Sequence, residues 1–339
     1  YKIFEGDILM SLTGNVGRVG RYPKELLPAY INQRVCRVMP KNEKLDTNFL
    51  FHFLNSDVFE NEAIKNSAGA AQLNLSTKWL GDFEIPLPNL ATQQRIATIL
   101  DQADAIIQNN RTIVQKYDAL MQSLFLEMFG DPVKNEKGWN LTKFSNVLTK
   151  IESGWSPVCE NYSRGNEKEW AVLKLGAVSY GIYNPKENKK CGFEIPNSKI
   201  DCEVKQGNLL FTRKNTYHMV GKTAFVHETE PRLLLPDTVF RLVYNSEKAN
   251  PIFLYYLLNH NKFILEIQSL ASGTSGSMPN ISKAKLLEKD LIFPSVELQN
   301  QFAERVAMIE AQKQQVQLEL AKSEELFASL LQRAFKGEL

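Results

Sequence analysis

Residue types that carry out chemistry are present in this chain, but their spacing fits no familiar catalytic pattern. The segment 13–20 holds three glycines, yet it lacks the Lys-Ser/Thr pair of a phosphate loop and the spacing of a dinucleotide fingerprint. We therefore expect turn glycines there. Asp201, Glu203 and Lys205 resemble part of a nuclease site, but the separation that normally divides the first acid from such a pair is missing.

Metal ligands and nucleophiles are equally dispersed. The four cysteines show no CxxC spacing, which is typical of free thiols in a reducing compartment, and the four histidines do not cluster. The sequence has no methyltransferase tetrapeptide of the Asn-Pro-Pro-aromatic kind and no GxSxG or HExxH motif. We therefore expect no catalysis, no metal and no cofactor. The chain is more typical of a binding and scaffolding protein.

Length and composition indicate a globular protein with two domains. The 339 residues are 43% hydrophobic and 23% charged, and no stretch approaches the roughly 18 uninterrupted apolar residues of a membrane span. We expect no membrane partner and a cytoplasmic location. The net charge of +2 neither favours nor excludes nucleic acid, so basic groups that bind a polyanion would have to cluster on one face.

The chain contains the same segment twice. Phe49–Asn55 returns as Phe253–Asn259, a shift of 204 residues (253 − 49). Asn74-Leu75-Ser76 returns as Asn280-Ile281-Ser282, a shift of 206 (280 − 74). A period this long is far beyond a solenoid unit and predicts a duplicated domain. Two related domains in one chain suit a target that is itself read in two places.

Each copy is expected to be α+β. Asp7–Leu12 and Asn208–Thr212 read as short buried strands, each introduced by a glycine turn. The ranges 47–64 and 251–269 read as helices. The second copy has a longer N-terminal portion, because the first begins just before its matching strand.

Two long heptad patterns follow the copies, at 91–129 and 297–336, and both come after a Pro-containing segment. We assign the first apolar stripe to Ile96, Ile99, Ala103, Ile106, Val114, Tyr117, Leu120, Leu124 and Met128, with Asn110 where an apolar residue is due. The second stripe comprises Phe302, Val306, Ile309, Val316, Leu320, Phe327, Leu330 and Ala334. Helices of about 36 residues would each span about 54 Å at ~1.5 Å per residue.

These helices are expected to bury their stripes against each other as an antiparallel coiled-coil spacer between two similar globular domains. Intermolecular pairing, which would give self-association through the helices, is the alternative. The expected domains are 1–88 (N-terminally incomplete), the first spacer helix 89–131, the second domain 132–295 and the second spacer helix 296–339.

The combined marks resemble one family. They are Gly6-Asp7-Ile8-Leu9 with Gly207–Arg213, Leu73–Ser76 with Met278–Ser282, and Ile85–Pro88 leading to Gln93-Gln94 with Phe293-Pro294 leading to Leu298–Phe302. Because these segments occur in this order, twice and at this spacing, the chain resembles the DNA-specificity subunit of Type I restriction–modification systems. The resemblance implies two target-recognition domains reading a bipartite site in double-stranded DNA. It also implies methyltransferase (modification) subunits and a restriction/translocase subunit as partners, without catalysis in this chain. The alternative is a non-enzymatic coiled-coil protein-interaction scaffold.

Candidate reading residues lie on exposed polar loops, because base edges are recognised by Arg, Lys, Asn, Gln, Ser and Thr. The loop candidates are Ser11, Thr13, Asn15 and Arg18 in the first copy and Thr212, Arg213, Lys214, Asn215, Tyr217 and His218 in the second. A further pair of segments contributes Gln72, Asn74, Ser277 and Asn280. Solvated hairpins are the alternative in both places. Lys174 and Lys222 are weaker candidates, since a lone lysine usually faces solvent.

Apolar residues beside the helical stripes suggest a docking surface for the modification subunits. These residues are Ile107, Met121, Phe125, Leu326 and Leu331. They make the apolar face broader than a two-helix seam requires. The alternative is that they pack on the adjoining globular domains.

Overall fold

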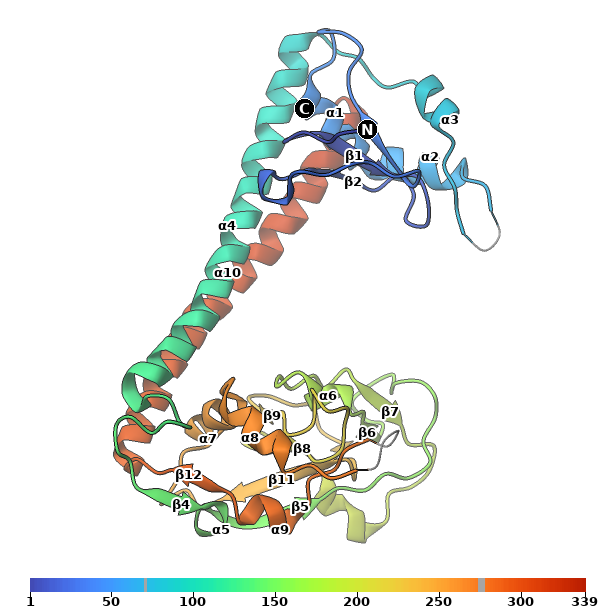
Figure 1. Cartoon of the computed structure of the whole chain (residues 1–339). Coiled ribbons are helices and arrows are strands. Elements are labelled where there is room, and N and C mark those ends of the chain that lie inside the picture. The colour runs from blue at the N-terminus through green and yellow to red at the C-terminus, as the bar shows by residue number, and fades with distance from the viewer. Residues whose placement is uncertain (70–71, 274–277) are drawn as a thin grey trace. The chain divides into compact units, whose positions relative to one another are not determined.

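Strands and helices mix in both structural units of the chain, as an α+β fold requires. A computed structural model describes residues 1–69, 72–273 and 278–339. Unit 1 comprises residues 1–116 and 312–339, and unit 2 comprises residues 117–311. Figure 1 shows the elements of each unit. No helix among the described residues combines the length and apolar character needed to cross a membrane.

Unit 1 is built on a three-stranded antiparallel sheet in the order β2-β1-β3. Its elements are β1 (Ile8–Ser11), β2 (Val19–Arg21), the 3-10 turn η1 (Lys24–Leu26), β3 (Val35–Val38), α1 (Thr47–Leu54), α2 (Asp57–Lys65) and α3 (Thr77–Asp82). Ile8 and Met10 of β1 are buried, whereas the residues between and after them are only half-buried. This alternation places one face of the sheet on a core that includes Phe53 and Phe59.

The described residues of unit 2 form three sheets, in the orders β5-β11-β8-β9, β10-β6-β7 and β12-β4. Its strands are β4 (Leu141–Lys143), β5 (Leu148–Ser153), β6 (Ala171–Leu173), β7 (Asn188–Lys190), β8 (Leu209–Thr212), β9 (Thr223–Phe225), β10 (Leu233–Leu234), β11 (Val239–Tyr244) and β12 (Asp290–Ile292). Its shorter helices are α5 (Phe144–Val147), α6 (Gly176–Ser179), η2 (Asn197–Cys202), α7 (Pro251–Asn259), α8 (Phe263–Ser269) and α9 (Lys283–Leu287). All four residues of β8 are buried, so this strand lies at the centre of the unit.

The two helices predicted at 47–64 and 251–269 are each broken into two. Ser56 ends the first as an N-cap, because its side chain accepts a hydrogen bond from Phe59 N and begins α2. His260 has an extended backbone and separates α7 from α8. The uninterrupted helices were wrong because apolar periodicity continues across a break that a cap residue imposes.

The repeat is structural as well as sequential. In both units a β-hairpin carries a loop whose glycine, Gly17 or Gly221, has a φ of +80° or +83°. A Cβ on Gly17 would lie 2.9 Å from Ala63 Cβ of α2, and one on Gly221 would lie 2.7 Å from Ile267 of α8. Only glycine meets both the left-handed backbone and this close approach.

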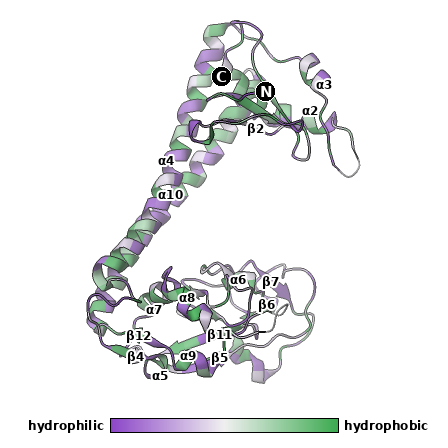
Figure 2. Cartoon of the chain, viewed as in Figure 1, coloured by the Kyte–Doolittle hydropathy of each residue, from purple (hydrophilic) through white to green (hydrophobic). Residues whose placement is uncertain are grey.

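The long helices α4 (Leu90–Phe129) and α10 (Val296–Lys336) pair antiparallel within one chain. In unit 1, Leu100 packs in one cluster with Leu330 and Ala334. Further along α4, Arg111 donates to Glu324, which lies earlier in α10, over 2.7 Å. Because the later residue of α4 contacts the earlier residue of α10, the two helices run antiparallel. Figure 2 shows hydrophobic and hydrophilic residues alternating along both helices.

The seam between these helices is a strict heptad series. On α4 the seam consists of positions 96, 100, 103, 107, 110, 114, 117, 121, 124 and 128. On α10 it consists of the positions 206 residues later, which are 302, 306, 309, 313, 316, 320, 323, 327, 330 and 334. All of these residues are buried or half-buried. Ile107 and Met121 are 4% and 2% exposed, while Ile106 and Leu120 are 52% and 48% exposed. The predicted stripe was therefore shifted by one residue at Ile106 and Leu120, and also at Ile99, where the seam residue is the fully buried Leu100.

A buried glutamine anchors each long helix to its own unit. In unit 1, Gln93 accepts from Asp46 N at 2.8 Å and donates to the carbonyl oxygens of Lys44 and Pro88. In unit 2, Gln299 accepts from Asn250 N at 2.9 Å in the same way. Asp46 and Asn250 are the N-cap residues of α1 and α7. Each glutamine thus ties the start of a long helix to the start of the helix packed on it.

Candidate nucleic-acid interface

Two loops occupy the same place in the two units. The β1–β2 loop comprises residues 12–18, and the β8–β9 loop comprises residues 213–222. Both are held by a neighbouring extended segment through equivalent backbone hydrogen bonds. These run from Leu75 N to Leu12 O and from Ile281 N to Arg213 O at 2.8 Å, from Gly14 N to Leu73 O at 2.9 Å, and from Asn215 N to Pro279 O at 3.3 Å. The two loops therefore present side chains from the same backbone frame.

Asn74 and Asn280 form hydrogen bonds within the segments that hold the two loops. Their backbone N–H groups donate to Ala68 O at 2.8 Å and to Ser272 O at 3.0 Å. The Asn280 side chain accepts from Arg213 at 3.2 Å, and the Asn74 amide donates to the backbone carbonyl oxygen of Gln72, whose side chain is exposed. Ser277, another candidate, lies outside the described residues.

Arg213 is held by its own unit. Its Nε donates to the Asp237 carbonyl oxygen at 2.5 Å, and Nη2 lies 3.8 Å from the Asp237 carboxylate. The guanidinium also lies over the Phe240 ring, 5.4 Å from its centroid. These contacts occupy the N–H donors of the planar guanidinium, which would otherwise pair with a base or a phosphate. Arg213 therefore supports the loop in this structure.

Thr212 and Asn215, which were predicted to read bases, are buried in this structure. Thr212 has no exposed surface, and its hydroxyl lies 2.8 Å from the Met219 carbonyl oxygen, to which it donates. Asn215 is 5% exposed and donates to Ser179 Oγ at 2.9 Å. Polar side chains at loop ends satisfy buried hydrogen-bonding groups as readily as they face solvent, and spacing alone does not distinguish the two.

The exposed tip of the β8–β9 loop is formed by Lys214, Thr216, Tyr217 and His218. Tyr217 is 54% exposed, and its ring meets the His218 ring edge-on at 5.9 Å. Thr216 lies within the predicted loop but was not selected as a reading residue, although its place between two selected residues was an available signal. The tip offers an ammonium, a hydroxyl, a phenol and an imidazole to a partner.

The β1–β2 loop is shorter and less charged. The Ser11 hydroxyl donates to Thr13 O at 3.1 Å, so it supports the turn. Arg18 pairs with Glu60 at 3.0 Å while 71% of its side chain stays exposed, and such surface pairs are weak. Asn15 is exposed at the loop tip. Asn15 and Arg18 are thus the most accessible of the predicted reading side chains in this loop.

A buried histidine joins α1 to α4 in unit 1. His52 Nε2 lies 2.7 Å from Asp101 Oδ1, and Asp101 Oδ2 accepts from the Asn48 amide at 2.9 Å. Asn48 in turn accepts from Arg21 of β2 at 2.7 Å. Burial lowers the pKa of His52 below its ordinary value, and the hydrogen bond to Asp101 only partly opposes this. The network ties the sheet, α1 and α4 together.

The expected docking residues divide into buried and exposed groups. Met121 and Phe125 belong to the core of unit 2, where Tyr256 donates to the Met121 sulfur at 3.0 Å. Ile107 is buried, and Leu331 is half-buried in the cluster that contains Leu100. These four residues pack within the chain, which is the alternative that the sequence left open. Leu326 alone of the five is well exposed, at 56%.

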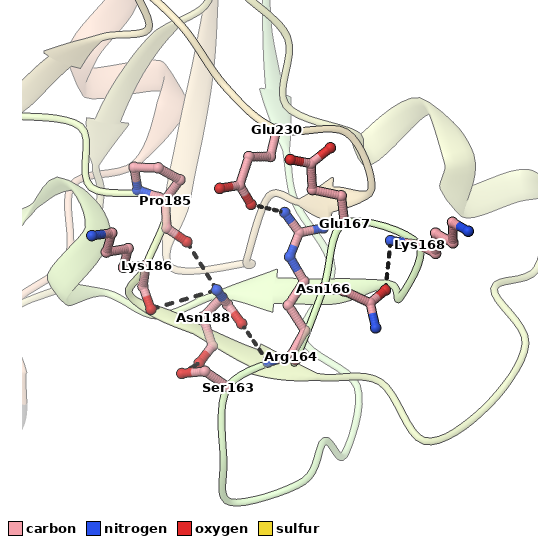
Figure 3. Close-up of a pocket in the computed structure, with 10 residues that line it drawn as sticks. Ser163, Arg164, Asn166, Glu167, Lys168, Pro185, Lys186, Asn188 and Glu230 are labelled. Carbon is pink, nitrogen blue, oxygen red and sulfur yellow. Dashed lines mark hydrogen bonds and ion pairs between the residues drawn. The ribbon is translucent and has the colours of Figure 1, made fainter.

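A separate cavity of about 740 Å³ lies between the 163–168 and 185–188 segments of unit 2 (Figure 3). Arg164 donates to Glu230 and to the Pro231 carbonyl oxygen, and the Asn188 side chain accepts from Arg164 N at 3.0 Å. The buried polar groups of this cavity satisfy one another. Among the described residues, no group of three or more His, Cys, Asp or Glu side chains is placed to hold a metal ion.

Comparisons with known proteins agree with this geometry. The family described as "Type I restriction modification DNA specificity domain" matches residues 1–116. The EcoKI specificity subunit of Escherichia coli K12 is 24% identical over the whole chain, which spans 76% of that subunit. The EcoEI specificity subunit of E. coli is 29% identical over 48% of this chain and 27% of its own length.

Solved structures share the fold. The S subunit of a Type I restriction–modification system from M. genitalium has a TM-score of 0.57 at 16% identity, covering 98% of this chain and 83% of its own. A chain from a type I R-M system studied for complex assembly and conformational transition has a TM-score of 0.58 at 18% identity, covering 100% of this chain and 83% of its own.

The repeated loop frames and the antiparallel helices define a tandem recognition subunit, in which two related domains carry equivalent loops. The chain is similar over its whole length to specificity subunits of type I restriction–modification systems, and its residues 1–116 match their DNA specificity domain.

Proposed function

We propose that this chain is the non-catalytic subunit that reads a bipartite sequence in double-stranded DNA. The observation that carries the proposal is the repeated frame, in which equivalent backbone hydrogen bonds hold the β1–β2 and β8–β9 loops. A frame used twice presents two sets of side chains to two separate half-sites. The names of the relatives support this reading, and the cytoplasm is the proposed place of action.

The proposed reading residues are the accessible side chains of these loops. Lys214, Tyr217 and His218 serve the second half-site, and Asn15 and Arg18 serve the first, with Gln72 beside them. Side chains with amide, ammonium or guanidinium groups recognise base edges in the major groove. Phosphate contacts add affinity without sequence information, so the loop tips supply most of the selectivity.

We also propose that modification subunits dock on the long helices, with a restriction subunit joining the assembly. The exposed Leu120 of α4 and Leu326 of α10 are equivalent at the shift of 206 residues (326 − 120). Each is suited to one subunit of a pseudo-symmetric pair. Leu120→Gln with Leu326→Gln should lower the amount of co-purified methyltransferase, whereas Leu265→Gln, at an exposed leucine of α8, should not.

The function is tested by selection of randomised duplex DNA with the full chain, alone and with a methyltransferase partner. We expect enrichment of a split motif, in which two short fixed sequences flank unread base pairs. Equal recovery of all sequences with retained co-purification of protein partners would instead favour the protein-interaction scaffold.

A further inference from the structure

A groove of about 460 Å³ lies next to the β8–β9 loop in unit 2. It is lined by the 156–159 segment, by residues 172–175 of β6 and the turn after it, by Lys189 of β7, and by Pro236 and Thr238. The Thr238 carbonyl oxygen accepts from both Arg213 N and Lys214 N, at 3.1 and 3.3 Å. The groove therefore shares its rim with the base of the proposed reading loop.

Two lysines lie on the groove face of the β6–β7 pair. Lys189 is opposite Val172 in the register, so both side chains point to the same side of the sheet. Lys174 follows Val172 by two residues, and Lys174 N donates to Glu187 O at 2.8 Å, which extends the pairing beyond β6. Side chains alternate along an extended strand, so Lys174 shares that side. Both lysines line the groove together with Val172.

The lysines are available to an anion. Lys189 is exposed, and about a third of the Lys174 side chain is exposed (34%). The Lys174 ammonium lies 3.8 Å from Glu187, which is too long for a hydrogen bond, and the Glu187 side chain is itself 45% exposed. Such a loose surface pair costs little to break.

Asp237 fixes the groove wall relative to the loop. Its Oδ1 accepts from the Ser156 hydroxyl at 2.6 Å, and its N–H donates back to Ser156 Oγ at 3.0 Å. The same residue accepts from Arg213 through its carbonyl oxygen. Its negative charge is thus engaged by the chain, and the groove and loop are held as one surface before any partner binds.

We propose that this groove binds the phosphodiester backbone of DNA beside the second half-site, with Lys174 and Lys189 contacting phosphates. The inference rests on the proposed function and adds an anchoring surface outside the loops. A flexible ammonium serves a phosphate as a point charge. Val172, Leu173 and Leu175, which also line the groove, have aliphatic side chains that cannot hydrogen-bond to base edges.

The test is the salt dependence of DNA binding by the full chain, measured on a duplex with the selected motif and on an unrelated duplex. Lys174→Gln with Lys189→Gln should flatten the slope of log affinity against log salt by about 1.8, because each phosphate contact contributes about 0.9. The selected motif should stay unchanged. Lys168→Gln with Lys205→Gln removes the same charge from exposed positions that do not line the groove and should leave the slope near wild type.

An unchanged slope in the groove variant would overturn the inference, as would an altered second half-motif, since the lysines would then contact bases. Equal flattening by the control pair would also overturn it, because the effect would belong to net charge. If the wild type selects no motif, the proposed function fails, while the slope on the unrelated duplex still decides the groove. Absence of all DNA binding would sink both.

Discussion

Arg213 was selected as a base-reading residue for its chemistry, but in the structure it supports the β8–β9 loop. Its guanidinium is held by Asp237, Asn280 and the Phe240 ring, while the neighbouring Lys214 is exposed. Adjacent residues of a loop thus differ in role because one side chain points into the unit and the next points away. Recognition of bases is expected from the outward side chains.

Replacing the outward pair Lys214→Ala and Tyr217→Ala should change the second half-motif while the first stays as it is. Each good base contact contributes roughly 1–3 kcal/mol of discrimination, so positions read by these side chains should relax visibly. The measurement is selection and sequencing of randomised duplex. Arg213→Ala with Asn215→Ala is the comparison: it leaves buried partners unsatisfied and should lower the melting temperature of unit 2. A melting temperature equal to wild type would contradict the supporting role.

His52 makes the stability of unit 1 depend on pH. Burial holds the pKa of His52 below its ordinary value of 6.5, so the folded state favours the neutral ring. The contribution of neutral His52 to the free energy of unfolding is complete above pH 6.5. It is lost as the pH falls below that value, because the unfolded chain then binds the proton more readily than the folded chain. Denaturant unfolding should therefore show lower stability at pH 5.5 than at pH 7.5.

The matched variant is His52→Tyr, because the equivalent residue of the second copy is Tyr256 (256 − 52 = 204). This variant should lose most of the pH difference between 5.5 and 7.5. Stability that rises on acidification of the wild type would show that the Asp101 pair outweighs burial.

At the scale of elements, the seam of α4 and α10 determines which residues hold the helices together. Ile106 and Ile107 are neighbours of the same type, yet one is 52% exposed and the other 4%. Ile107→Ala should cost about 2–5 kcal/mol of unfolding free energy, as for other buried isoleucines. Ile106→Ala should stay within about 0.5 kcal/mol of wild type. Chemical denaturation of both variants checks this, and equal costs would contradict the assigned seam.

The same helices show what sequence reasoning could and could not predict. Their existence followed from sustained heptads, whereas the heptads alone left open whether they pair within one chain or between two. Gly130 and Gly337 follow the helix ends with a positive φ. The predicted stripe was off by one residue at Ile99-Leu100, Ile106-Ile107 and Leu120-Met121, because two adjacent apolar residues satisfy the periodicity equally. Subtracting the repeat shift of 206 residues from the α10 positions gives the correct seam residue of each adjacent pair on α4.

The candidate site was harder to predict than the fold. Sequence located both loops, because glycine turns and repeat positions mark them. It did not separate Thr212 and Asn215, which are buried, from Lys214 and Tyr217, which are exposed. That distinction depends on where each side chain finds a hydrogen-bond partner, such as Ser179 far away in sequence. The Gln93 and Gln299 anchors were quoted as family marks, and only the structure gives them a physical role.

For the whole molecule, we propose that one chain reads two half-sites at a spacing set by its helices. Because α4 and α10 pair antiparallel, a change of length must be made in both helices to keep the seam in register. Residues 110–116 of α4 and 319–325 of α10 form such a pair of heptads, since Arg111 faces Glu324. Each heptad corresponds to about 10 Å of helix.

The most direct measurement is motif selection with the variant that lacks both heptads, compared with the wild type. The variant should recover both half-motifs unchanged, with the unread gap shortened by about three base pairs at ~3.4 Å each. Circular dichroism should confirm that the helices remain folded. Recovery of the wild-type gap from the folded, shortened chain would contradict the claim that the paired helices set the spacing.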